Sequence, residues 1–108
     1  MIEIARYITR AGKDVIGEWL SGLRDERASA KIRARINRLA TGNFGDCRAV
    51  RQGVYELKVD WGPGYRVYYA TTGKTSVLLL VGGDKRTQTS DIARAIENWK
   101  DYKRRIAP

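Results

Sequence analysis

Two spacings of apolar residues organise the first forty positions of the chain. Within residues 2–8, Ile2 and Ile4 alternate with other residues, and this two-residue period is typical of a strand. A helix is predicted after Asp14, whose carboxylate suits the N-cap position, because the apolar residues that follow recur every three or four positions. They are Val15, Ile16, Trp19, Leu20 and Leu23.

A second helix is predicted between Asp25 and Gly42, since glycine commonly ends helices. Its apolar face is formed by Ala28, Ile32, Ile36 and Leu39. The link between the two helices is short, so we expect an antiparallel helical hairpin. The next segment, 42–46, reads GNFGD and is predicted to be a loop, because it is rich in turn-forming residues.

Three further strands are predicted between residues 54 and 83. In 54–61 the apolar side chains face one way and the polar ones the other. The apolar face has Tyr55, Leu57, Val59 and Trp61, and the polar face has Glu56, Lys58 and Asp60. A Gly-Pro-Gly turn leads into a return strand, 65–70. Residues 75–81 are apolar at both parities, which favours a central strand covered on both sides, and Gly82-Gly83 is expected to end it.

A closing helix is predicted from about Ser90. Its apolar face has Ile92, Ile96, Trp99 and Ile106. Asp91 in the first turn and four cations near the end both suit the helix dipole. The predicted order is strand, helix, helix, three strands, helix. At 108 residues, the chain is expected to form one domain, 1–108.

Charge changes this picture by suggesting a partner. The 21 Lys and Arg residues exceed the 12 Asp and Glu residues, giving a net charge of +9, and such an excess indicates a polyanionic partner or simply a basic surface. A stripe of cations lies about 100° around the second helix from its apolar face. We interpret this stripe either as a solvated face or as a contact for RNA phosphates or an inhibitory protein. Its members are Arg24, Arg27, Lys31, Arg35 and Arg38.

Several kinds of chemistry are excluded or disfavoured. Histidine is absent, so Ser–His, Cys–His and His–metal sites are excluded. The single Cys47 cannot form an intrachain disulfide and has no metal-ligand spacing around it; we expect no cofactor, no metal and a reducing, cytoplasmic location. The N-terminus lacks a signal-peptide core, and the longest apolar run, Val77 to Val81, is too short for a membrane span.

The polar face of the predicted two-stranded hairpin is a candidate site for RNA cleavage. With the other face packed, its side chains would lie together on an open face, joined by two cations from the end of the central strand. The set is Glu56, Lys58, Arg66, Tyr68, Lys85 and Arg86. Such a set suits phosphate, although the same residues also fit ordinary cross-strand ion pairs.

RNA cleavage requires activation of a 2′-hydroxyl, stabilisation of phosphoryl charge and protonation of the leaving 5′-oxygen, none of which needs histidine. We expect Arg66 to clamp the phosphate. Lys58 or Lys85 would transfer protons, with a pKa lowered by the neighbouring cations, and Glu56 is a second candidate base. Tyr68 and the helical stripe would contact RNA.

Several short segments, spread from about residue 14 to 100, form a recognisable set. They are EWL at 18–20 with Leu23, IRARI at 32–36 with RL at 38–39, GNFGD at 42–46, GVYELK at 53–58, GPGYRVYY at 62–69, GGDKRTQ at 82–88 and DI at 91–92. Together these segments resemble the RelE/ParE superfamily of toxins, in the HigB-like branch of addiction-module killer proteins.

This resemblance implies an α+β fold in which an N-terminal strand and a helical hairpin pack on an antiparallel sheet, with a closing C-terminal helix. It also implies a toxin of a type II toxin–antitoxin system that cuts mRNA on the ribosome without a cofactor. A helix-turn-helix antitoxin would neutralise it and would alone carry the complex to operator DNA. The strand cation of the family corresponds to Lys58, the arginine of the next strand to Arg66, and the basic pair to Lys85 and Arg86.

Two features of the resemblance leave the activity open. RelE-like toxins often have a catalytic tyrosine or histidine near the C-terminus, whereas here Tyr102 falls inside the closing helix. ParE-like members of the same superfamily inhibit DNA gyrase without cutting RNA, so the alternative is a non-enzymatic gyrase inhibitor.

Overall fold

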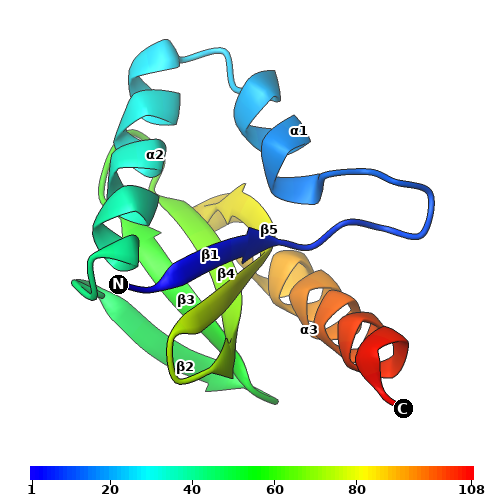
Figure 1. The fold of residues 1–108 in the computed structure, drawn as a ribbon. Coiled ribbons are helices and arrows are strands. Elements are labelled where there is room, and N and C mark those ends of the chain that lie inside the picture. The colour runs from blue at the N-terminus through cyan, green and yellow to red at the C-terminus, as the bar shows by residue number, and fades with distance from the viewer.

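A mixed sheet of five strands separates two layers of helices in the computed structural model, which describes residues 1–108 (Figure 1). The strand order is β1-β5-β4-β3-β2. The helices α1 and α2 cover one face, and α3 covers the other. The strands are β1 (Glu3–Arg6), β2 (Cys47–Arg51), β3 (Val54–Val59), β4 (Tyr65–Gly73) and β5 (Ser76–Asp84). The helices are α1 (Val15–Gly22), α2 (Glu26–Ala40), the short 3₁₀ turn η1 (Lys85–Thr87) and α3 (Gln88–Ile106).

The α+β class, the helical hairpin and the closing helix are confirmed. The sheet is not wholly antiparallel, because β1 runs parallel to β5 while the other neighbouring pairs are antiparallel. A parallel pair needs a long crossover. The helical hairpin begins that crossover by carrying the chain from β1 across one face of the sheet (Figure 1).

Aspartates begin both helices of the hairpin, as the sequence predicts. The side chain of Asp14 accepts a hydrogen bond from the Gly17 amide at 3.0 Å. Asp25 accepts bonds from the amides of Arg27 and Ala28 at 2.9 and 3.3 Å. Gly42, with φ of +89°, follows the end of α2. These caps satisfy amides that have no partner inside the helix.

The hydrophobic residues form two cores, one on each face of the sheet. The first lies beneath α1 and α2 and contains the predicted core residues, either buried or packed against its edge. They are Trp19, Leu20, Ile32, Ile36, Tyr55, Leu57, Val59, Val67 and Leu79. The second core, beneath α3, includes Tyr7, Tyr68, Ala70, Leu78, Leu80, Ala95 and Ile96. None of the three α-helices has the length and apolar character that a membrane span requires.

Gly82 and Gly83 do not end the central strand, because β5 continues to Asp84. Each glycine makes room for a side chain from one helical layer. A Cβ atom on Gly82 would collide with the Trp19 ring of α1, and one on Gly83 would collide with the carboxylate of Asp91 of α3. The pair is therefore explained by close packing on both faces of β5 rather than by turn formation.

The edge strand β2 is not predicted by the sequence pattern. Its five residues, CRAVR, include two exposed arginines, and its pairing with β3 shifts register between Ala49 and Arg51. Short, charged and irregular strands are common at sheet edges. Consequently the hydrophobic alternation on which the strand prediction depends is weak here.

Candidate functional site

Three of the predicted site residues lie beneath α3 and not on an open face. Glu56 and Tyr68 are 0% exposed and Arg66 is 8% exposed. The expected alternation along β3 and β4 is correct, but the face opposite the helical hairpin is covered by a second layer. The prediction that these three residues are exposed is therefore wrong.

Glu56 is the centre of a buried charge cluster. One carboxylate oxygen accepts a bond from Arg48 Nε of β2 at 3.1 Å, and the other accepts one from Gln88 Nε2 at the start of α3 at 2.8 Å. Arg66 Nε lies 3.5 Å from that second oxygen. Burial alone would raise the pKa of Glu56, but the bonds from Gln88 and Arg48 and the two arginine charges hold the pKa below its usual value.

Tyr68 does not offer its ring or hydroxyl to a ligand in this structure. The hydroxyl is buried without a hydrogen-bond partner. Burial, followed by the nearby charges of Glu56 and Asp91, raises the pKa of the phenol. Tyr68 is therefore a residue of the second core, and the prediction that it contacts RNA is not kept.

A small cavity at the end of the sheet gathers Lys58, Arg66 and Lys85. Lys58 and Arg66 are directly paired positions on β3 and β4, and Lys85 follows β5. The cavity has a volume of about 220 Å³ and also includes Asp60 and the turn 62–64. Two bonds define its shape, since the carbonyl of Gly64 accepts one from Arg66 Nη1 at 3.2 Å and one from the Lys85 amide at 2.9 Å.

Arg86 is not part of this cavity. Its guanidinium is exposed and paired with the carboxylate of Asp84 at 2.8 Å. The side-chain bond from Arg86 is the main reason that the pKa of Asp84 lies below its usual value. The structure thus separates Arg86 from Lys85, although the two are neighbours in the sequence.

A larger cavity of about 450 Å³ lies between α2, residues 45–46 and the end of β3. Lys58 and Asp60 line this cavity as well as the smaller one. The two cavities therefore adjoin, and together they are called the basic groove. Its cations are Lys31, Arg35, Arg38, Lys58, Arg66 and Lys85.

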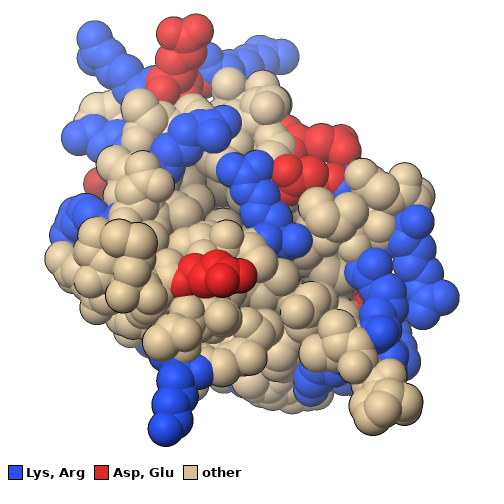
Figure 2. All heavy atoms as spheres, in the orientation of Figure 1, with Lys and Arg blue, Asp and Glu red and all other residues tan.

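The predicted helical stripe is only partly in this groove. Arg24 and Arg27 are exposed near the start of α2 and line neither cavity. Arg35 is half-buried and donates from Nη2 to the carbonyl of Phe44 at 3.0 Å, so it connects α2 to the following loop. Figure 2 shows Lys and Arg side chains over α2 and near the C-terminal end of α3.

Two groove residues had no predicted functional role. Asp60 is the exposed carboxylate that both cavities share. Trp61, expected to be in the core, is only half-buried and lines the larger cavity, with Lys31 Nζ 4.7 Å from the centre of its ring. Arg48 and Gln88, which hold Glu56, were missed because one lies on the unpredicted strand β2 and the other begins α3 before the expected start. No three acidic or thiol side chains gather closely enough to hold a metal ion.

Comparison with known proteins shows the family of this chain. Residues 18–100 match the model of a family described as phage derived protein Gp49-like (DUF891). The chain belongs to this family. A relative from Haemophilus influenzae, described as an uncharacterized protein, is 54% identical over 77 residues, which cover 71% of this chain and 78% of the relative.

The Gp49-like family belongs to the group of addiction-module killer and RelE-like toxins. It is related to toxin–antitoxin systems, is associated with endoribonuclease toxins and implies an antitoxin partner. All six cations of the basic groove fall within the matched residues, whereas β1 precedes them.

Proposed function

We propose that this Gp49-like protein is the toxin of a type II toxin–antitoxin system and cuts mRNA on the ribosome, with the RNA in the basic groove. The observation that carries the proposal is that Lys58 and Asp60 line both cavities. Because of this, the cations at the end of the sheet continue into those of α2, and one RNA strand can contact both. The group to which the family belongs supports a toxin.

Phosphate binding is assigned to the smaller cavity. The guanidinium of Arg66 lies between Glu56 and the carbonyl of Gly64, so its orientation is set before the substrate arrives. Donors fixed in this way stabilise charge that develops in a transition state without reorganising. Lys31 and Arg38 on α2 would bind the neighbouring phosphates of the same strand.

Glu56 is assigned a positioning role. Both of its oxygens already accept hydrogen bonds, and its side chain has no exposed surface. A base must reach the proton that it removes, and Glu56 does not reach the groove. The earlier expectation that Glu56 is a base is therefore replaced by the proposal that it orients Arg66.

Asp60 takes the role of base in this proposal. Its carboxylate would accept the proton of the 2′-hydroxyl, whose oxygen attacks the adjacent phosphorus atom. The bond from phosphorus to the 5′-oxygen then breaks, and the amino group of Lys58 or Lys85 gives that oxygen a proton. The products are a 2′,3′-cyclic phosphate and a 5′-hydroxyl, formed without a metal ion.

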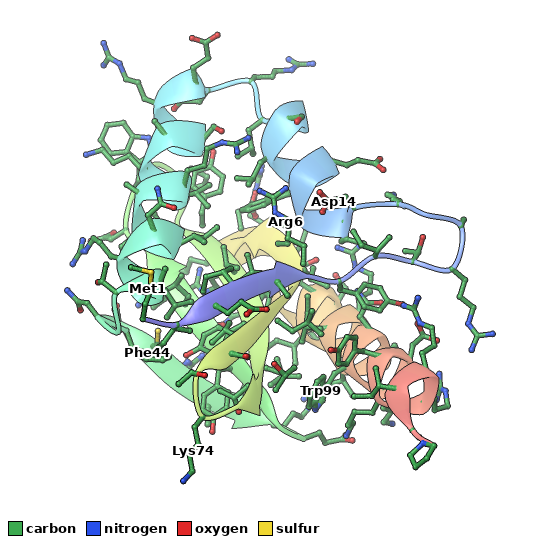
Figure 3. The ribbon with its side chains drawn as sticks, in the orientation of Figure 1. Met1, Arg6, Asp14, Phe44, Lys74 and Trp99 are labelled. Atoms are coloured by element: carbon green, nitrogen blue, oxygen red, sulfur yellow. The ribbon has the colours of Figure 1, made fainter.

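Lysine variants test this assignment. Lys58→Ala and Lys85→Ala should each slow cleavage of ribosome-bound mRNA by about 10²–10³-fold, as expected when a general acid or a cation that stabilises the transition state is lost. Primer extension on stalled ribosomes measures the rate. The matched control is Lys74→Ala, since Lys74 is an exposed lysine at the turn between β4 and β5 and extends away from the sheet (Figure 3). Its cleavage rate should equal that of the parent.

Three results would contradict the proposal. The site is wrong if Lys58→Ala cuts as fast as the parent. The metal-independent mechanism is wrong if the product carries a 3′-hydroxyl, or if EDTA stops cleavage at a concentration that leaves ribosomes enough Mg²⁺. The enzyme assignment fails if the parent cuts no mRNA but inhibits DNA supercoiling by gyrase.

A further inference from the structure

Trp61 has an unusual position for a large aromatic residue in this protein. It follows β3 at a bend, packs with part of its ring against the first core and lines the larger cavity with the rest. The indole nitrogen lies 3.4 Å from a carboxylate oxygen of Asp25, the N-cap of α2. The ring therefore lies between the end of the sheet and the start of a helix, with its nitrogen directed at Asp25.

The face of this ring is covered by the charged ammonium group of Lys31. Lys31 Nζ lies 4.7 Å from the ring centre, and Lys31 is an exposed side chain on a flexible stem. A cation–π contact at an exposed site is worth less than stacking of a nucleobase on an aromatic ring. A base can therefore displace the ammonium group, which is then free to pair with a phosphate of the same strand.

Trp99 offers a comparison within the same chain. Lys103 Nζ lies 5.0 Å from the centre of its ring, nearly the arrangement of Lys31 and Trp61. However, the Trp99 ring stacks on Tyr102 with a centre-to-centre distance of 5.9 Å. Trp99 belongs to α3 (Figure 3) and lies outside the basic groove. Trp61 lies among the cations and the carboxylate of that groove. Tyr65, the other aromatic residue that lines it, makes an edge-to-face contact with Trp19.

We propose that Trp61 is the platform on which a base of single-stranded RNA stacks, next to the phosphate that is cut. This inference rests on the proposed function, because the same groove holds the strand. Lys58 and Asp60, which line the cavity together with Trp61, place the stacked base beside the reacting groups. Stacking is tolerant of base identity, so Trp61 holds the strand in register and does not read a particular base.

Binding of an uncleavable strand tests the platform without any cleavage. The probe is a short single-stranded RNA with 2′-O-methyl groups throughout, compared with an abasic strand of equal length and charge. Trp61→Leu should weaken binding of the base-bearing strand by about 5- to 150-fold, the range for loss of one stacked base. It should leave binding of the abasic strand unchanged, and Trp61→Phe, which keeps an aromatic face, should bind the first strand nearly as the parent does.

Intrinsic fluorescence provides a second readout. The base-bearing strand should quench tryptophan emission in the parent and in Trp99→Phe, but not in Trp61→Phe. Circular dichroism on each variant establishes that it is folded, and Trp61→Phe keeps the test valid if Trp61→Leu does not fold.

The outcomes separate the platform from the proposed function. If Trp61→Leu weakens the binding of both RNA strands equally, or of neither, the platform proposal is wrong even though the parent still cuts mRNA. Quenching that persists in Trp61→Phe also overturns it. If the parent neither cuts mRNA nor binds either strand, the proposed function itself is wrong.

Discussion

Arg66 has only 8% of its surface exposed, yet its guanidinium reaches the smaller cavity beside Lys58 and Lys85. The buried part faces Glu56, which also receives bonds from Arg48 and Gln88. Removal of one partner from a buried charge cluster leaves the others without compensation. This residue therefore supports both the fold and the candidate site, whereas exposed Lys58 supports only the site.

Arg66→Ala should lower the free energy of unfolding by about 1–3 kcal/mol, because Glu56 loses one of its buried partners but keeps two. Lys58→Ala should change it by no more than about 0.5 kcal/mol, since an exposed side chain is removed. Urea unfolding of both variants measures the difference. Equal stability of the two variants would show that Arg66 does not stabilise the buried cluster.

At the level of elements, β5 contacts both helical layers, and its two glycines lie where a side chain from each layer approaches the strand most closely. Trp19 of α1 lies over Gly82, where it also makes an edge-to-face contact with Tyr65 at 6.2 Å between ring centres. Such packing has little room to relax. Each glycine thus allows the helix above it to pack closely against the sheet.

Gly82→Ala should destabilise the protein by about 1–3 kcal/mol, because the added methyl group overpacks the contact with Trp19. Gly73→Ala is the matched control on the neighbouring strand, since nothing lies within 4 Å of the position that its Cβ would take. Its stability should stay within about 1 kcal/mol of the parent. Thermal unfolding of both proteins provides the measurement, and a similar loss in both would mean that the contact with Trp19 is not what requires glycine.

The elements with strong periodicity could be predicted from the sequence. The stripes of α1 and α2, the Asp14 cap of α1 and the alternation along β3 all correspond to observed features. The edge strand β2 could not, because its charged residues face solvent at the sheet margin. The parallel pairing of β1 also could not, since alternation indicates a strand but not its neighbour.

The candidate site was partly predictable for a related reason. Strand pairing brought Lys58 and Arg66 together as the alternation implies. The covered face could have been inferred, because residues 77–81 are apolar at both parities and a layer over the central strand also covers its neighbour. By contrast, Asp60 and Trp61 enter the groove through the fold of the chain at the end of β3, which no periodicity describes.

For the whole molecule, the net charge is +9, and six of the cations line the basic groove. If the proposed function is correct, this groove must be kept from RNA when the toxin is silent. An acidic segment of a helix-turn-helix antitoxin is the partner that we propose for this groove. Opposite charges across such an interface set its specificity and speed of association. The antitoxin would also be the only part of the complex that contacts operator DNA.

Binding of the antitoxin should weaken as salt concentration rises, because charges on the groove are screened over about 8 Å at physiological ionic strength. Replacement of Arg38, an exposed cation of the groove, by Ala should reduce this salt dependence. Arg24→Ala, outside both cavities, should leave it nearly unchanged. Isothermal titration at several salt concentrations measures both effects, and an affinity that ignores salt would indicate an apolar interface instead.

The parallel pairing of β1 with β5 joins the first strand of the sequence to the last. Ribosomes make the chain from its N-terminus, so β1 has no partner until β5 has been synthesised. α3, which supplies Gln88 to the Glu56 cluster, follows later still. A partly synthesised chain therefore lacks the Gln88 bond that helps to hold Glu56 beside Arg66. The order of translation delays completion of this cluster until the whole sheet and the start of α3 have emerged.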